Sequence, residues 1–480
     1  MASFPARRVL LPRLVLTELC ADNQSGCILR TIPKTPRSNS TTYSYRVKTR
    51  DMRGGRVPCA YNHFPIVLDG VSGAPWRPAV LYLLDLISNA TRISNAIDTA
   101  QSTASDLASY KRFLEDDHID YQEFPSNINL RPTYRFRAFL LSQVELGEIK
   151  KTTARRRMSS VVRFYRWLIN KNYMAPENEP WKESDVYIEI DDQFGMAKTL
   201  KIKSTDLSIK IPTQFDPYSG YIYDEARLRP LSVYEQQVLI EVLLKTNNIE
   251  MKIFHLLAIV TCARLQTILT LRAHQFLDPP PKYSKEIRLP VGFGTETDTK
   301  FDKEIVLHIP IWLYEKIHIY AQSDRAVKRR MRASEQSNSY LLLTNRGTPY
   351  YESKSDRGSF NPDINSAQSK KGGGIRQFIR DYILPSMKNE FGENYNYSPH
   401  DLRATGGMNC TNQMLERVKA GEINLLQARN YVKTIMGHSD SKVTDLYLNF
   451  GVNCEYFIKI RSEYDLYLEK LMESVSYEKL

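Results

Sequence analysis

The spacing of apolar and polar residues predicts a helical domain between residues 76 and 176. Apolar positions first recur at helical intervals in the run 79–97, and a further helix is indicated to begin at Thr103. Two more helices are predicted over 134–146 and 153–170, the last with a continuous apolar stripe. These segments predict a compact four-helix unit.

The last of these helices also has a strongly basic face. Between Lys150 and Lys171 the chain carries eight Lys and Arg residues and no Asp or Glu. A helix that is merely solvated usually carries Glu and Lys at i,i+4 spacing, and this segment has no such pair. We therefore favour phosphate contact over a solvated basic face. The predicted DNA-binding residues are Lys150, Lys151, Arg155, Arg156, Arg157 and Arg163.

The regions on either side of this unit have β character. Residues 1–75 show weak periodicity and receive no functional assignment, whereas residues 177–228 alternate apolar and polar positions and are predicted to be a β-rich linker. Short strands are predicted at 42–47, 65–68, 186–190, 199–203 and 207–211.

A second helical domain is predicted over 229–480. Ser232 stands three residues before Glu235 in a capping box, and apolar residues follow at helical spacing. A strand pair is predicted over 286–291 and 303–309, after which helices resume. The expected fold class is therefore mainly α with a small β-hairpin, arranged in two domains.

The charge of the chain favours a polyanionic partner. Its 480 residues include 66 Lys and Arg against 54 Asp and Glu, a net charge of +12, so nucleic acid is the first candidate. The longest apolar run, 253–263, is too short to cross a bilayer. The N-terminus lacks the unbroken apolar stretch of a signal peptide. We therefore expect a cytoplasmic, nucleoid-associated protein without membrane contact.

The cysteines are scattered, with no CxxC pair and no His at zinc-ligand spacing. They are Cys20, Cys27, Cys59, Cys262, Cys410 and Cys454. This pattern predicts neither a disulfide framework nor a structural metal site, and it fits a reducing compartment.

Three segments of the second domain carry side chains suited to phosphate chemistry. Arg264 lies in a strongly apolar segment, where a buried guanidinium needs an anionic partner. His400 and Arg403, at i and i+3, share a helix face, and Tyr447 stands nine residues after His438. Taken singly, each residue has a structural explanation: a snorkelling arginine, a satisfied histidine, or one of 29 tyrosines.

Together, these segments resemble the catalytic boxes of the tyrosine recombinases, also called phage-type integrases. The matching residues are Cys262-Ala263-Arg264, His400-Asp401-Leu402-Arg403, and Met436-Gly437-His438 with Tyr447. The resemblance covers about residues 230–450. It implies that the preceding helical unit is a core-binding (SAM-like) domain, which grips DNA opposite the catalytic domain.

The family also places a catalytic Lys in the turn between two strands. Lys300 fits this position better than Lys303, because the apolar alternation from Ile305 onward sets the register. The sequence departs from the family's pattern at two places. Thr267 replaces the Glu that many members carry three residues after the first Arg, and 404–407 read Ala-Thr-Gly-Gly in place of His-Thr-Phe.

The resemblance and the side-chain chemistry assign a role to each residue. Two arginine forks can bind the non-bridging oxygens of a scissile phosphate, and a tyrosine can store the bond energy as a reversible 3′-phosphotyrosine. The expected roles are oxyanion binding by Arg264 and Arg403, attack by Tyr447, proton relay by His400, phosphate binding by His438, and protonation of the leaving 5′-oxygen by Lys300.

No metal or ATP is expected, because the boxes lack a carboxylate cluster and the chain lacks a phosphate-binding GxxxxGK[ST] loop. The expected partner is double-stranded DNA, bound by a homo-tetramer on two sites during integration or excision of a mobile element. The need for accessory DNA-bending proteins stays open. Two alternatives are a type IB topoisomerase-like enzyme and a catalytically silent DNA-binding regulator.

Beyond Tyr447, apolar residues at helical spacing predict an amphipathic tail helix. Its apolar residues are Phe457, Ile460, Tyr464, Tyr467, Leu468 and Leu471. Because recombination joins two duplexes, we favour docking of this helix on a neighbouring protomer over packing on its own domain.

Overall fold

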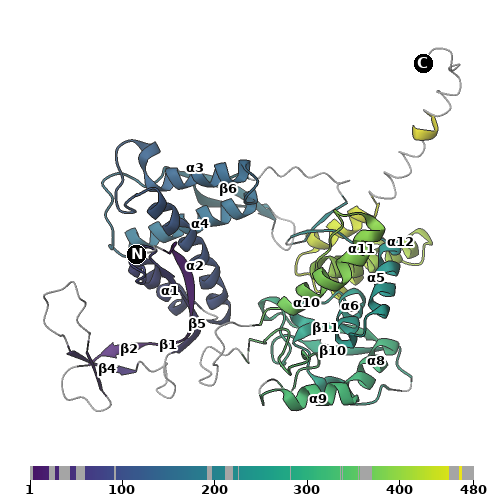
Figure 1. Ribbon diagram of the computed structural model, residues 1–480. Helices are drawn as coiled ribbons and strands as arrows, with labels where there is room; N and C mark the ends of the chain where they lie inside the picture. The colour runs from purple at the N-terminus through teal and green to yellow at the C-terminus, as the bar shows by residue number, and fades with distance from the viewer. Residues whose placement is uncertain are drawn as a thin grey trace. The chain divides into compact units, whose positions relative to one another are not determined.

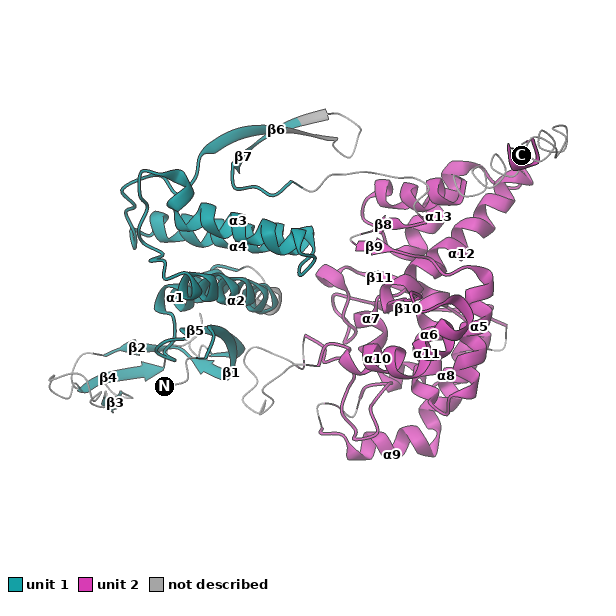
Figure 2. Cartoon of the chain, turned by 45° about the horizontal axis from the view of Figure 1, so that its top comes forward, with its two compact units in different colours: residues 1–213, 357–368 teal, residues 214–356, 369–480 magenta. Residues whose placement is uncertain are grey.

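The computed structural model describes residues 4–20, 27–31, 44–49, 60–90, 93–191, 197–210, 220–224, 226–281, 283–335, 337, 339–354, 356, 370–452 and 464–467. The chain divides into two compact units (Figures 1 and 2). The N-terminal unit comprises 1–213 and 357–368, and the C-terminal unit comprises 214–356 and 369–480. The mainly helical, two-unit fold with small β-hairpins agrees with the expected fold class.

The N-terminal unit is built on the predicted helices. They are α1 (Arg77–Ser88), α2 (Ile93–Asp116), α3 (Pro132–Glu145) and α4 (Lys151–Asn170), with a 3₁₀ turn at Ile128–Leu130. Proline in the first turn of α1 and of α3 suits the helix start, because the N–H it lacks would have no partner there. Thr103 lies inside α2 rather than at a helix start, since α2 already begins at Ile93.

The core of this unit is aromatic. Tyr110 and Tyr165 are fully buried and share a hydrogen bond of 2.6 Å between their hydroxyl groups. Phe64, from strand β5 (Ala60–Leu68), joins the same core, as does Leu207 from beyond α4. Parts of the predicted N-terminal segment and of the predicted linker therefore belong to this unit.

Small antiparallel sheets complete the N-terminal unit. Strand β1 (Arg7–Val15) pairs with β5, and β6 (Glu183–Asp191) pairs with β7 (Ala197–Thr205). The described residues 207–210 are not a strand, contrary to the prediction. A third sheet has the order β2-β4-β3, with strands Thr17–Leu19, Ser44–Thr49 and Ile28–Thr31.

A disulfide joins Cys20 at the end of β2 to Cys27 just before β3. The expectation of no disulfide was therefore wrong for this pair. The spacing of the cysteines in the sequence did not predict this disulfide, because the two residues are brought together by the pairing of both strands with β4. Cys262 and Cys410 are free, and Cys59 and Cys454 lie outside the described residues.

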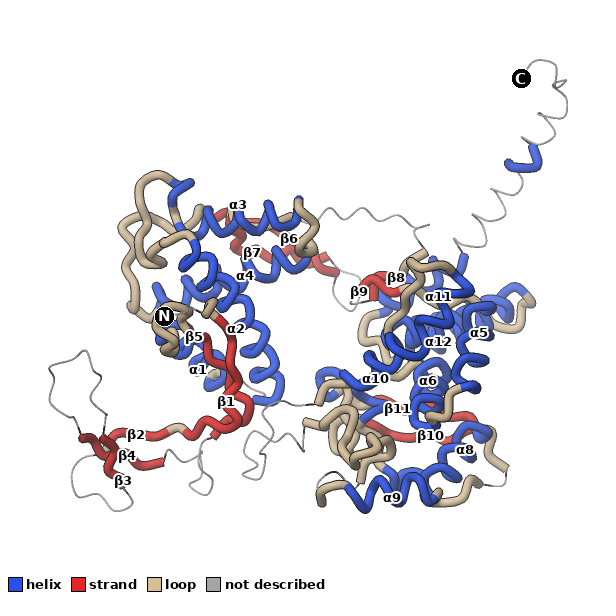
Figure 3. The backbone as a smooth tube through the Cα atoms, viewed as in Figure 1, coloured by secondary structure: helices blue, strands red, loops and turns tan. Residues whose placement is uncertain are grey.

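The C-terminal unit surrounds the predicted hairpin with helices (Figure 3). Strand β10 (Glu286–Val291) pairs antiparallel with β11 (Ile305–Pro310), close to the predicted ranges. A second, short hairpin joins β8 (Ile222–Asp224) to β9 (Ala226–Leu228). The predicted capping box is confirmed, since Ser232 and Glu235 cap the first helix of the unit.

The longer helices of this unit are α5 (Val233–Lys245), α6 (Ile249–Thr261), α8 (Ile311–Gln322), α9 (Asp324–Arg332), α11 (Leu384–Phe391), α12 (Pro399–Lys419) and α13 (Leu425–Met436). Shorter helical segments are α7 (Leu265–Leu269), α10 (Gly373–Phe378), Ala273–Phe276, Lys300–Asp302 and Ile379–Ile383. Described residues 441–452 and 464–467 are also helical. Most of the predicted tail helix lies outside the described residues. None of the described helices combines the length and hydropathy needed to cross a membrane.

Helix α12 packs closely on α6. A Cβ atom at Gly406 would overlap the carbonyl oxygen of Ile259, and one at Gly407 would lie 2.9 Å from Cε1 of Tyr447. Glycine at positions 406 and 407 is therefore required by the close approach of α6 and of the Tyr447 ring.

We expect Gly406→Ala to lower the free energy of unfolding by about 3 kcal/mol, because a backbone carbonyl cannot move aside without separating the helices. Gly373→Ala is the matched control, since a Cβ atom there meets no heavy atom within 4 Å. Urea denaturation of both variants measures the difference. Equal unfolding midpoints would contradict the close packing of α12 on α6.

Candidate active site

The three boxes meet around Arg403. Its Nη1 donates a hydrogen bond to the carbonyl of Cys262, and its Nη2 donates to the carbonyl of Met436 at 2.9 Å. Cys262 ends α6 in the left-handed conformation, with φ of 54°, and Met436 ends α13. Arg403 is only 4% exposed. One buried guanidinium from α12 thus ties the ends of α6 and α13 together.

Arg264 stands directly after this junction, as the residue that precedes α7. It is half-buried, and its charge acts on several groups of the site. It lowers the pKa values of Lys303, His400 and His438, in each case in addition to the effect of burial. Arg264 therefore contributes positive charge to the same site as Arg403. Thr267, where the family often has Glu, is buried inside α7.

His438 and Tyr447 lie side by side. Gly437 ends α13 with φ of 63°, which turns the chain so that His438 enters the interior. His438 Nδ1 is 3.0 Å from Thr444 Oγ1, and the ring centroids of His438 and Tyr447 are 5.6 Å apart. Tyr447 has 0% exposed surface.

A carboxylate that the sequence did not predict lies between these side chains. Asp224, at the end of β8, accepts a hydrogen bond from the Tyr447 hydroxyl at 3.0 Å. The same oxygen, Oδ2, lies 3.5 Å from His438 Nε2 and 3.9 Å from Arg403 Nε. Asp224 is therefore an anionic neighbour of the buried Arg403 guanidinium.

The pKa values follow from this arrangement. Burial raises the pKa of Asp224, but interaction with His438 and the charge of Arg403 outweigh it and bring the pKa to about 2. Burial and the adjacent Asp224 carboxylate raise the pKa of Tyr447. Burial also lowers the pKa of His438, so its imidazole is neutral near pH 7. The site therefore holds an ionised carboxylate against a protonated phenol.

The strand turn brings Lys303 to this site. Lys303 Nζ donates a hydrogen bond to the carbonyl of Gly437 at 2.8 Å. Burial and the charges of Arg264, Lys433 and Arg403 lower its pKa. Lys300 Nζ lies 5.0 Å from the ring centroid of Phe301.

The backbone of this turn departs from the extended register on which the prediction of Lys300 was based. Phe301 and Asp302 both have positive φ, of 60° and 55°, so the chain reverses between Lys300 and Lys303. Strict alternation of side-chain direction holds only along an extended strand and is lost at this reversal. The geometry therefore favours Lys303 as the lysine of the site.

His400 lies at the edge of the site. It is an exposed residue in the first turn of α12 and lines an open cavity of about 360 Å³ together with Arg376 and Tyr397. Partial burial and the charges of Arg376, Arg264 and Arg403 lower its pKa. Its neighbour Asp401 caps α12 with Ser398. No cluster of His, Cys, Asp and Glu that could hold a metal ion is found among the described residues.

The basic face of α4 is only partly free, because other elements supply carboxylates. Arg156 Nη1 pairs with buried Asp106 at 2.7 Å, and Arg166 pairs with Glu183 at 2.9 Å. Lys171 pairs with Asp85 at 3.1 Å. Arg157 is half-buried and lines a different cavity, with Arg7, Arg8 and Arg112. Among the described carboxylates, none pairs with the exposed residues Lys150, Arg155 and Arg163 or with half-buried Lys151.

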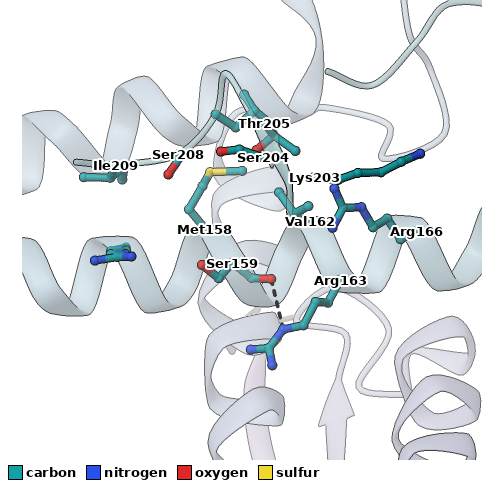
Figure 4. Close-up of a pocket in the computed structure, with 12 residues that line it drawn as sticks. Met158, Ser159, Val162, Arg163, Arg166, Lys203, Ser204, Thr205, Ser208 and Ile209 are labelled. Atoms are coloured by element: carbon teal, nitrogen blue, oxygen red, sulfur yellow. Dashed lines mark hydrogen bonds between the residues drawn. The ribbon is translucent and has the colours of Figure 1, made fainter. Parts of the chain in front are cut away.

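A groove of about 180 Å³ runs between α4 and the end of β7 (Figure 4). Arg155, Arg163, Arg166 and Lys203 line it together with the hydroxyl groups of Ser204, Thr205 and Ser208. Figure 4 shows Arg163 against the backbone of Ser159, to whose carbonyl its Nε donates at 3.2 Å. Cations and hydroxyl groups in one groove are suited to phosphate oxygens.

No protein-family model and no curated protein matches the sequence of the chain. Among solved structures, it is similar to a lambda integrase dimer bound to a COC′ core site, with 12% identity, a TM-score of 0.45, and coverage of 78% of this chain and 94% of that chain. It is also similar to the Tn1549 transposon integrase in complex with circular intermediate DNA, with 15% identity, a TM-score of 0.39, and coverage of 77% and 94%. Likeness at this level assigns no function to the chain, so a functional proposal must rest on the side chains.

The side chains brought together are suited to transesterification of a phosphodiester. Two guanidinium groups and a lysine provide positive charge, a neutral histidine provides a hydrogen bond, and a phenol provides a nucleophile. Of the residues predicted from the sequence, the structure brings together Arg264, Arg403, His438 and Tyr447, and it places His400 at the edge of the site. Asp224 was not predicted from the sequence, and Lys303 was considered there but ranked below Lys300.

Proposed function

We propose that the chain is a tyrosine-type DNA strand transferase, which cuts and rejoins DNA as a site-specific recombinase. The observation that carries this proposal is the grouping of four basic side chains in one site with the buried Tyr447. Arg403 and His438 lie against Asp224, which accepts the hydrogen bond of the Tyr447 hydroxyl. Lys303 contacts the carbonyl of Gly437 next to His438, and the charge of Arg264 acts on both Lys303 and His438. A structural tyrosine has no need of so many cations in one place, and they are costly to bury together.

The reaction follows from these groups. The Tyr447 oxygen attacks the scissile phosphorus; its bond to phosphorus forms as the bond from phosphorus to the 5′-oxygen breaks. Arg264 and Arg403 stabilise the charge on the non-bridging oxygens, and His438 donates a hydrogen bond to one of them. The phenolic proton passes to a neutral imidazole, for which His400 has a suitably lowered pKa.

Lys303 completes the proton balance by giving a proton to the leaving 5′-oxygen. Its lowered pKa makes the ammonium a better acid than an ordinary lysine. The product is a 3′-phosphotyrosine and a free 5′-hydroxyl, and the reverse attack by a 5′-hydroxyl restores the DNA backbone. No step requires a metal or ATP. We propose integration or excision of a mobile element by a tetramer on two sites as the setting of this chemistry.

Covalent trapping tests the proposal directly. The full chain is incubated with nicked duplexes drawn from the DNA that flanks its gene, because the loss of a short 5′-fragment traps the covalent intermediate. We expect a protein–DNA adduct on a denaturing gel, formed equally well in the presence of EDTA. Failure to form an adduct on any flanking duplex, together with tight binding to one of them, would favour a silent DNA-binding regulator.

The groove beside α4 gives a separate prediction for DNA binding. Arg155→Ala combined with Arg163→Ala should reduce the slope of log affinity against log salt by roughly two units, because each phosphate contact contributes about 0.9. Fluorescence anisotropy over a series of salt concentrations measures the slope on unrelated duplexes.

Arg135→Ala combined with Lys171→Ala is the matched control, because it removes the same charge from two residues outside the groove that already pair with Asp117 and Asp85. We expect its slope to change by less than one unit. If both double variants lose the same slope, net charge alone explains binding and the groove has no specific role.

A further inference from the structure

The position of Asp224 has a consequence for how the proposed site is regulated. Three different side chains, those of Tyr447, His438 and Arg403, converge on one of its oxygens, Oδ2. Asp224 is 6% exposed and Tyr447 is 0% exposed, so neither group faces solvent. His438 Nε2 is buried and makes no hydrogen bond among the described residues. This imidazole nitrogen is therefore available to an acceptor that sits closer than Asp224 does.

The oxygen of Asp224 has the surroundings that the scissile phosphate requires. A carboxylate and a phosphodiester each carry one negative charge shared by two oxygens, and both accept hydrogen bonds from arginine and imidazole. Two such anions cannot share these donors, because like charges at this separation repel strongly. DNA therefore cannot bring a phosphate to Arg403 and His438 while Asp224 remains between them.

The hairpin that carries Asp224 is also anchored at its base. Ile222 and Leu228 pair across β8 and β9 and are buried in the same cluster as Tyr447. After the hairpin, the backbone N–H of Arg229 donates to Asp401 Oδ1 at 2.7 Å, and the N–H of Leu231 donates to Thr405 Oγ1 at 2.9 Å. Figure 2 shows β8 and β9 beside α12 and α13. The hairpin end that bears Asp224 can thus withdraw while these bonds to α12 persist.

We propose that Asp224 is an autoinhibitory carboxylate: it occupies the seat of the scissile phosphate and holds the Tyr447 hydroxyl until substrate DNA displaces the end of the β8–β9 hairpin. This inference rests on the proposed function, since it assigns a regulatory residue to the same site. It predicts that the free protein is inactive towards small phosphodiesters and weakly bound phosphates, which cannot displace a tethered anion.

The main alternative is that Asp224 is a catalytic base for Tyr447. Against this stands the direction of proton transfer, because the carboxyl has a pKa of about 2 and the phenol has a raised pKa. A carboxylate this weakly basic leaves the proton on the phenol. The two roles make opposite predictions for removal of the carboxylate.

Single-turnover formation of the covalent adduct on a nicked duplex distinguishes them. Asp224→Ala should form the adduct on the order of tenfold faster than the wild type. The substitution vacates the phosphate position beside Arg403 and His438, and it frees the Tyr447 hydroxyl from its hydrogen bond to Asp224. Tyr223→Ala is the matched control: it alters the neighbouring, exposed residue of the same strand and should leave the rate unchanged. A rate that falls or stays the same in Asp224→Ala would overturn the inference.

Asp224→Asn provides a second variant with the shape of the native side chain. It keeps a hydrogen-bond acceptor for Tyr447 but removes the charge that satisfies Arg403, so it should also accelerate adduct formation, by less than Asp224→Ala does. If Asp224→Ala fails to fold, as judged by its thermal unfolding, the rate of Asp224→Asn decides the question.

Binding of inorganic phosphate separates this inference from the proposed function, because it needs no DNA cleavage. By isothermal titration, the full-length Asp224→Asn protein should bind phosphate at least tenfold more tightly than the wild type. Tighter phosphate binding without any adduct would reject strand transfer but retain Asp224 as the occupant of an anion seat. If the wild type forms an adduct but the Asp224 variants show neither faster adduct formation nor tighter phosphate binding, strand transfer is retained and the inhibitory role of Asp224 is rejected.

Discussion

Tyr447→Phe should abolish covalent adduct formation while leaving affinity for DNA unchanged. The substitution removes only the hydroxyl group, and the ring stays packed against Gly407 and His438. Because no other atom of the side chain can bond to phosphorus, we expect the adduct to fall below detection rather than to form slowly. A denaturing gel reports the adduct, and fluorescence anisotropy reports binding.

Tyr431→Phe is a suitable control, since Tyr431 lies on α13 within the same unit and is exposed. This variant should retain wild-type rates. Residual adduct in Tyr447→Phe would show that another nucleophile is used. A parallel loss of DNA binding would mean that the hydroxyl has a structural role through its bond to Asp224.

Lys303→Ala should slow cleavage of normal DNA by roughly 10²- to 10⁴-fold, the range expected for loss of a general acid. The reason is the position of its ammonium group, which lies beside Gly437 and is influenced by Arg264 and Arg403. Lys300→Ala is the control within the same turn and should change the rate little. Gel-based single-turnover assays with both variants measure the difference.

A substrate with sulfur in place of the bridging 5′-oxygen sharpens this test. Sulfur leaves readily as an anion and needs no proton, so Lys303→Ala should recover most of its rate on this substrate. Arg264→Ala should not recover, because its defect is the loss of charge stabilisation. Rescue of Lys300→Ala instead would return the role to Lys300, and rescue of neither variant would place the acid outside the turn.

Helices and motif boxes could be predicted from the sequence because both are local. The stripe of α4, the capping box before α5 and the strands around 286–310 all follow from residues within a few positions of one another. The spacing from His438 to Tyr447 is similarly short. Local patterns did not identify which lysine of the turn reaches the site. The prediction assumed an alternation of side-chain direction, which two consecutive residues with positive φ interrupt.

Features that depend on distant contacts could not be predicted. Asp224 and Tyr447 are separated by 223 residues, and no spacing rule connects them. The partner of Arg156 lies on α2 and the partner of Arg166 on β6, so the absence of acidic residues within the helix did not mean absence of compensation. The Cys20–Cys27 disulfide likewise depends on strand pairing with β4.

The most direct test of the central claim is the position of the protein–DNA bond. The adduct formed by the wild-type chain is digested with nuclease and protease, and mass spectrometry locates the phosphorylated residue. We expect a 3′-phosphotyrosine on Tyr447. A phosphodiester link to any other tyrosine, or to a serine, would contradict the assignment of this buried phenol as the nucleophile.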